Sequence, residues 1–355
     1  MVKGRLGRWA LVLAAVWLLG GQALAEEILP EELRRAAPEA AELAESGDLA
    51  AGFSTLWERA WGEVSGYLLA GARSVAAIAA GVVLLGAVES SFSGGAAPRF
   101  TTMVGALWVT AVSAGDLGTL IGLGRETVSR VSLMAKVLLP VMAGATAASG
   151  GVAAASVGQV AAVFFSDLLL SVIQGVLLPA VYLYIGVSAA GTVLEGETMA
   201  GLGRLLKKAV TWSLTGMLTL FTGYLTISGA VAGAADARAV KLAKAAVSGA
   251  VPVVGSILAD AAETVLAGAG LLRATVGSFG TLAVLGLCLA PFLRLGSQYL
   301  LYQGAALVAQ TAGPKKLTTL LSTLGDAFGL VLAMTAASAV LLLIALVSSL
   351  TAVTV

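Results

Sequence analysis

Long runs of apolar residues, separated by short polar stretches, occupy most of the chain from residue 66 onward. Several of these runs exceed the ~18 residues that are typical of a transmembrane helix. The pattern predicts an all-α fold, a polytopic α-helical integral membrane protein with about seven transmembrane helices and a charged helical hairpin or re-entrant segment. Spans are expected at about 66–88, 100–122, 131–148, 209–228, 276–293 and 328–350, with 152–194 interpreted as two spans that meet near Pro179.

Three prolines lie inside these apolar runs, at positions 140, 179 and 291. They are expected to break helices at the depth of the bilayer, and broken helices often line cavities or substrate sites. Membrane helices also tolerate proline in general, so a purely structural role remains the alternative. Segment 296–312 is apolar but short, which is typical of an interfacial or re-entrant segment.

Composition agrees with the apolar pattern, because 58% of the residues are hydrophobic and only 12% are charged. A soluble domain carries about 25% charged residues. The chain has no histidine and a single cysteine, Cys288, so the sequence offers no intrachain disulfide and no Cys/His cluster for a metal. We find no Walker A, H-E-x-x-H or G-x-S-x-G pattern. We therefore expect no enzyme activity and no cofactor, and the net charge of +1 gives no reason to expect nucleic-acid binding.

The N-terminus has the pattern of an export signal. Lys3, Arg5 and Arg8 precede a short apolar core, and a small-x-small motif ends at Ala25. Cleavage after Ala25 is expected, with an uncleaved anchor as the alternative. The predicted organisation is a signal peptide (1–25), a short extracytoplasmic amphipathic lead whose aromatic face meets the membrane interface (26–65, with Phe53, Leu56, Trp57, Trp61 and Val64 at helical spacing) and a polytopic membrane domain (66–355).

Positive charge predicts the orientation of the spans. If the mature chain begins outside the cytoplasm, the basic segment that contains Arg204, Lys207 and Lys208 lies inside, as the positive-inside rule requires. The stretch 229–275 then lies on the outer side, and Lys315-Lys316 returns to the cytoplasm. The C-terminus is expected outside.

Two carboxylates lie within predicted spans, Asp116 in the second and Asp167 near the middle of its own. An ionisable group inside a membrane is a functional candidate by default. The alternative for each is a buried structural hydrogen bond, or a carboxyl group that stays protonated.

The stretch 229–264 carries six charges in an otherwise apolar chain. Three basic residues repeat at intervals of three, and two acidic residues do the same beyond Pro252. Lys244 and Asp260 each lie eight residues from Pro252, and Lys241 and Glu263 each lie eleven away. A helical hairpin that turns at Pro252 would bring these pairs together, whereas two solvated amphipathic helices are the alternative. The candidate residues of this segment are Arg238, Lys241, Lys244, Pro252, Gly255, Asp260 and Glu263.

This segment resembles the stage III sporulation protein AE family. The residues that carry the resemblance are Ala239–Lys244, the run Val251-Pro252-Val253-Val254-Gly255 and Asp260–Val265, together with Ile173–Pro179. The order of spans from residue 66 to the C-terminus is also similar. The resemblance is weak over 26–65, which look shorter than the corresponding part of the family.

The resemblance implies a membrane component of the channel-like, secretion-like complex that links mother cell and forespore after engulfment, in the mother-cell membrane around the forespore. It implies as partners the other stage III sporulation A-operon proteins, including an ATPase, and indirectly stage II sporulation protein Q. A homo-oligomer in the lipid bilayer is also compatible with the residues. The alternative is a self-contained secondary transporter for a small solute, suggested by the prolines and by Asp116 and Asp167.

Overall fold

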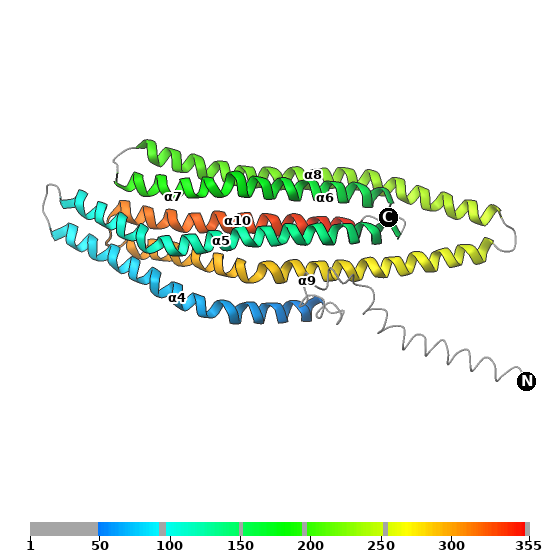
Figure 1. Cartoon of the computed structure of the whole chain (residues 1–355), viewed down its shortest axis with the longest axis horizontal. Coiled ribbons are helices and arrows are strands. Elements are labelled where there is room, and N and C mark those ends of the chain that lie inside the picture. Colours follow the sequence, from blue (N-terminus) through cyan, green and yellow to red (C-terminus); the bar gives the residue numbers. More distant parts are fainter. Residues whose placement is uncertain (1–48, 92–96, 149–151, 194–196, 251–254, 352–355) are drawn as a thin grey trace, which may run out of the picture.

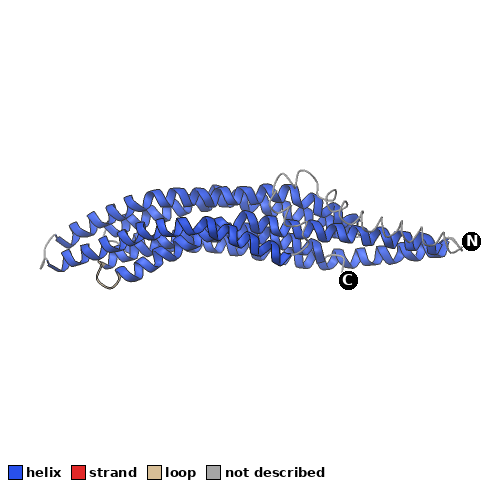
Figure 2. Cartoon of the chain, turned by 90° about the horizontal axis from the view of Figure 1, so that it is seen from below, coloured by secondary structure: helices blue, strands red, loops and turns tan. Residues whose placement is uncertain are grey.

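The chain folds into an elongated, gently curved bundle of long helices (Figures 1 and 2). The computed structural model describes residues 49–91, 97–148, 152–193, 197–250 and 255–351, and it describes no side chains for 49–50, 97–99, 152–159, 197, 228–250, 255–274 and 350–351. The helices are α4 (Leu49–Ser91), α5 (Ala97–Ala148), α6 (Val152–Val172), a π-helical turn η1 (Ile173–Leu177), α7 (Leu178–Val193), α8 (Glu197–Ala250), α9 (Gly255–Ala309) and α10 (Lys315–Thr351). The all-α membrane fold that the sequence predicts is confirmed.

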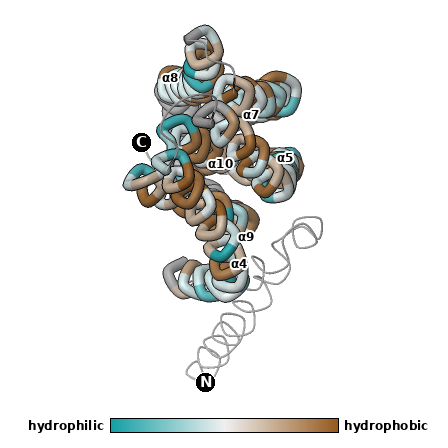
Figure 3. The backbone as a smooth tube through the Cα atoms, turned by 90° about the vertical axis from the view of Figure 1, so that its left-hand side faces the viewer, coloured by the Kyte–Doolittle hydropathy of each residue, from teal (hydrophilic) through white to brown (hydrophobic). Residues whose placement is uncertain are grey.

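Helix α10 lies in the middle of the bundle and contacts α5, α6, α7, α8 and α9 (Figure 3). Apolar side chains recur along it at helical spacing, and they are buried on several faces at once: Leu317, Leu321, Leu324, Phe328, Val331 and Leu342. Thr335 and Ser338 are also buried, and each hydroxyl donates a hydrogen bond to a carbonyl of the same helix. Helix α4 packs at one edge against α9 and α5, and α8 lies on the opposite side against α6 and α7.

The predicted number of about seven spans is not confirmed. Within the described residues, five helices are long and apolar enough to cross a membrane: Ala51–Ser91, Phe100–Ala148, Val160–Val193, Thr275–Ala309 and Lys315–Ser349. The predicted spans 100–122 and 131–148 both belong to α5. The two spans predicted within 152–194 form another continuous helical segment, made of α6, η1 and α7. The predicted sixth span lies within α8, which runs antiparallel to α7 along the bundle (Figure 1).

None of the three prolines ends a helical segment, so the prediction that they break helices is wrong. Pro140 and Pro291 lie inside continuous helices. Pro179 follows a π-helical turn, in which the amide of Leu178 bonds to the carbonyl of Ile173 five residues earlier. This wider turn accommodates the proline without ending the helix. Pro140 and Pro179 are also exposed on the outside of the bundle, so they line no interior cavity.

The segment 296–312 is likewise not a separate re-entrant piece, because its residues up to Ala309 complete α9. Arg294 lies within this helix, and its guanidinium carbon lies 3.7 Å from the centroid of the Tyr67 ring. The helix ends in a tight connection in which the amide of Gly313 bonds to the carbonyl of Ala309 at 2.7 Å. Helix α10 then begins at Lys315.

The aromatic positions of the predicted lead belong to α4, which continues without interruption into the first apolar run. Trp57 and Trp61 stack with their ring centroids 6.3 Å apart, and both are exposed. Leu56 and Val64 of the same helix are buried against the bundle. At helical spacing they form a stripe next to the tryptophans, so an exposed aromatic stripe adjoins a buried aliphatic one.

Some of the glycines lie where helices approach closely. On α10, Gly325 and Gly329 face α9, and a methyl group at Gly329 would lie 3.1 Å from the ring of Tyr299. The similar pair Gly118 and Gly122 on α5 faces open space. Of these two small-residue motifs, only the one on α10 works as a helix-packing motif.

The closest approach involves Gly86 of α4, where an added Cβ would collide with the backbone carbonyl of Ala312. We expect Gly86→Ala to lower the thermal stability of the detergent-solubilised protein, since overpacking typically costs about 1–3 kcal/mol. Gly66→Ala on the same helix is the matched control, because no atom lies within 4 Å of its added Cβ. That control should leave the melting temperature unchanged or raise it slightly. Equal melting temperatures for the two variants would contradict this account of the α4 contact.

Candidate functional site: a polar network among α7, α8, α9 and α10

A charged network joins four helices near the end of the bundle that carries the α9–α10 connection. The Lys207 ammonium of α8 lies 2.7 Å from Oδ2 of Asp326 on α10. The Tyr184 hydroxyl of α7 donates to the same oxygen at 3.3 Å, and the Gln303 amide of α9 donates to Oδ1 at 3.2 Å. The Ser322 hydroxyl donates to Oε1 of Gln303 at 3.0 Å. One carboxylate thus holds side chains from three other helices.

A cavity of about 500 Å³ opens beside this network, between α7, α8 and α10. Its polar lining includes Lys207 and Asp326 from the network, together with Arg204, Lys315 and Lys316. The sequence analysis predicts a cytoplasmic position for these basic residues, but it does not predict that they share a cavity. The structure brings them together because α8 and α10 begin at the same end of the bundle (Figure 1).

The predicted candidate Asp116 lies in a second, smaller polar contact between α5 and α9. Its Oδ2 accepts a hydrogen bond from the Gln298 amide at 3.3 Å and one from the Tyr302 hydroxyl at 3.4 Å. Tyr302 is fully buried and packs against Phe328, with ring centroids 5.0 Å apart. This arrangement matches the structural alternative, in which the carboxyl group fixes two helices.

Asp167 of α6 pairs with Lys136 of α5 at 3.0 Å. Both side chains are half-exposed, at 49% and 51%, so the pair lies on the outer surface of the bundle. Asp116 and Asp167 therefore belong to separate sites, and each has its own partners. They do not form a joint pathway through the described bundle.

The residues of the charged segment 229–264 lie outside the described side chains. Their backbones are helical up to Ala250 in α8 and from Gly255 in α9, and these two helix ends extend beyond α10 (Figure 1). Pro252 itself lies outside the described residues. The pairing of Lys244 with Asp260, and of Lys241 with Glu263, stays a prediction.

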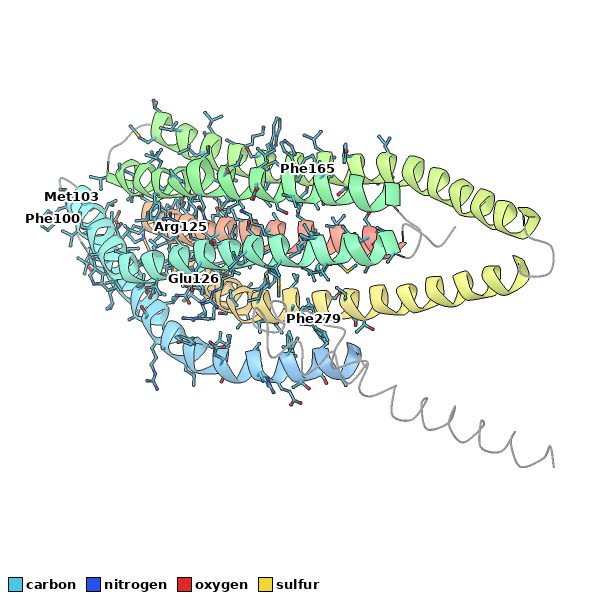
Figure 4. All side chains as sticks on the ribbon, turned by 45° about the vertical axis from the view of Figure 1, so that its right-hand side comes forward. Phe100, Met103, Arg125, Glu126, Phe165 and Phe279 are labelled. Carbon is cyan, nitrogen blue, oxygen red and sulfur yellow. The ribbon has the colours of Figure 1, made fainter. Side chains whose placement is uncertain are left out.

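Many large apolar side chains are exposed on the described bundle, and Figure 4 labels two of them, Phe100 and Met103. Phe100 and Met103 lie at the tip of α5 and are exposed. Phe165 instead joins α6 to α8, with its ring centroid 5.2 Å from that of Phe221. Arg125 and Glu126 lie on α5 in exposed positions. No group of three or more Cys, His, Asp or Glu side chains suited to a metal occurs in the described part of the chain.

Sequence reasoning missed Asp326, Tyr184 and Gln303 and treated Lys207 only as a marker of topology. One signal was available for Asp326, since it is the acidic residue that directly precedes the most apolar run of the chain. An ionisable group in that position is a functional candidate by the same rule that selected Asp116 and Asp167. Its partners lie as far as 142 residues away, so no local spacing reveals them.

Removing the Asp326 carboxylate should destabilise the bundle. We expect Asp326→Ala to lose hydrogen bonds from three helices, each worth about 1.5–3 kcal/mol when one partner is charged. Glu126→Ala is the control, because its ion pair with Arg130 is exposed at 59% and 63% and such pairs contribute about 0–1 kcal/mol. Thermal unfolding in detergent should show a clearly lower melting temperature for Asp326→Ala alone. A similar fall in melting temperature for both variants would show that the network contributes no more stability than a surface ion pair.

The family described as stage III sporulation protein AE matches residues 48–352. The stage III sporulation protein AE of Bacillus subtilis (strain 168) is 26% identical over 199 residues, which cover 56% of this chain and 50% of that protein. The chain therefore aligns with half the length of this relative. No solved structure matches. The family match over residues 48–352 confirms the resemblance: the chain belongs to the stage III sporulation protein AE family, a family of sporulation proteins.

Proposed function

We propose that this protein is a membrane subunit of a channel-like, secretion-like complex between mother cell and forespore, needed after engulfment. Membership of the stage III sporulation protein AE family over residues 48–352 carries this proposal. The protein would span the mother-cell membrane that surrounds the forespore several times. Its partners would be the other stage III sporulation A-operon proteins, including an ATPase, and indirectly stage II sporulation protein Q.

The packing of the bundle supports a subunit that works with other chains. Helix α10 fills the middle of the described bundle with buried side chains such as Leu324, Phe328 and Val331. A pathway for solutes would therefore form between copies or between partners rather than along the axis of one copy. The sequence also has no Walker A pattern, which fits energy supplied by a partner ATPase.

The self-contained transporter has less support than the subunit. The transporter hypothesis depended on broken helices around a central site. However, Pro140, Pro179 and Pro291 all lie within continuous helical segments. The candidates Asp116 and Asp167 lie in separate contacts with protein partners. These contacts hold helices together and leave no shared site for a coupling ion.

Deletion of the gene tests the role in development. We expect engulfment to be completed, heat-resistant spores to be lost and vegetative growth to remain normal, because the complex is needed only after engulfment. Microscopy with a membrane dye and counts of heat-resistant colonies measure the two stages, and a restored gene copy is the control. A growth defect in non-sporulating cells, or arrest before engulfment, would refute the proposal.

Topology gives a separate test of the membrane orientation. In a Cys288→Ser background, cysteines that replace Ala235 or Ser248 should react with an impermeant thiol reagent in intact protoplasts, because the charged end is expected outside. A cysteine in place of Thr311, an exposed residue of the α9–α10 connection, should react only after lysis. The parity of the crossings before Arg204 is unchanged, since there are two merged helices and each merger removes one crossing. The reverse labelling pattern would show that the orientation is wrong.

A further inference from the structure

Three serine side chains line one small cavity inside the bundle, and each comes from a different helix. Ser132 belongs to α5, Ser166 to α6 and Ser338 to α10. Their exposed fractions are only 6%, 9% and 7%. The rest of the lining is mainly aliphatic, with side chains such as Leu169 and Leu342. The cavity is therefore a polar point in an otherwise apolar contact among three helices.

One of these hydroxyl groups lacks a partner. Among the described residues, no donor or acceptor lies within hydrogen-bonding distance of the Ser132 hydroxyl. Buried polar side chains are hydrogen-bonded in the large majority of cases, so this group calls for an explanation. Ser132 lies in a helix that is long and apolar enough to cross a membrane, where lipid offers no hydrogen bond. Because Ser132 borders the cavity, its partner is expected inside it.

The size and the chemistry of the cavity select this partner. Its volume of about 10 Å³ is at the lower limit of the roughly 10–15 Å³ that one water molecule needs. No ionised side chain is part of its lining, so a cation there would lack a counter-charge in apolar surroundings, which is costly. A buried water typically has two to four polar partners, and three serines supply that number.

We propose that this cavity binds one ordered water molecule that bridges α5, α6 and α10. The Ser338 hydroxyl donates to the carbonyl of Thr335 at 2.8 Å, so its oxygen can only accept a further hydrogen bond. The water donates its two hydrogens to the oxygens of Ser338 and Ser166, and it accepts the hydrogen of Ser132. The site is independent of the proposed channel role, because it rests on this cavity alone.

The water site continues a polar contact that begins at the surface. Lys136 follows Ser132 by about one turn of α5, and Asp167 directly follows Ser166 on α6. The ion pair between Lys136 and Asp167 joins α5 to α6 at the outside of the bundle. The water joins the same two helices and also connects both to α10 in the middle.

A structure of the full-length protein in lipid nanodiscs, at a resolution that shows ordered water, tests the site directly. One density peak should lie about 2.5–3.0 Å from at least two of the three serine oxygens. A cavity without such a peak at that resolution, or one closed by shifts of its side chains, would overturn the proposal.

The melting temperature in detergent gives an independent test with a predicted sign. With the water bound, Ser132→Ala removes a satisfied hydroxyl and should lower the melting temperature by about 2 °C or more. Without the water, the same change removes an unsatisfied buried hydroxyl and should raise the melting temperature. Ser65→Ala is the control, because its exposed hydroxyl donates to the carbonyl of Gly62 at 2.9 Å and borders no part of the cavity. It should melt like the unmodified protein.

A double-mutant cycle tests whether the hydroxyl groups share one water. Ser132→Ala and Ser338→Ala should together lower the melting temperature by less than the sum of their separate shifts, because both act on the same bridging molecule. Additive shifts, or a Ser132→Ala variant that melts at or above the temperature of the control, would refute the bridge. Such results would indicate that each hydroxyl bonds within its own helix, as when Ser132 rotates toward the carbonyl of Val128.

Discussion

The close packing of α10 against the helices around it is the contact on which the rest of the bundle depends. In lipid the hydrophobic effect does not drive helices together, so tight van der Waals packing has to do so. Gly325 and Gly329 let α10 approach Tyr302 and the ring of Tyr299 on α9. That approach buries Phe328 completely, and it fixes how far α10 lies from α7 and α8 on its other side.

The same placement explains how an ionised group is tolerated on this central helix. Asp326 would be costly among apolar side chains, but α7, α8 and α9 each present a donor to it. The carboxylate and its neighbours therefore specify the relative positions of four helices, which apolar packing alone leaves freer. Asp116 has a similar role on a smaller scale, since its two donors both come from α9.

The sequence predicted the class of fold, and it failed at two kinds of position. The first kind is proline. In water this residue tends to end a helix, but here the surrounding helices and a π-helical turn keep 152–193 continuous. The sequence analysis also expected one span for each ~20 residues, so it assigned two spans to the single helix α5. The second kind is the polar network, whose members are far apart in the sequence. Lys207 and Asp326 are separated by 119 residues, and only the packing of α10 brings them together.

The length of the helices has a consequence for what surrounds the protein. At 1.5 Å per residue, the 52 residues of α5 extend about 78 Å, against a hydrocarbon layer of ~30 Å. Even a tilt of about 40° leaves a height of roughly 60 Å. Apolar side chains are nonetheless exposed far apart along the bundle, at Phe53 and Trp57 near the start of α4 and at Phe100 and Met103 near the start of α5. A layer of this thickness does not cover the whole length, and exposed apolar surface in water marks contacts with other chains. The dimensions of the bundle thus favour a protein whose ends are covered by other subunits.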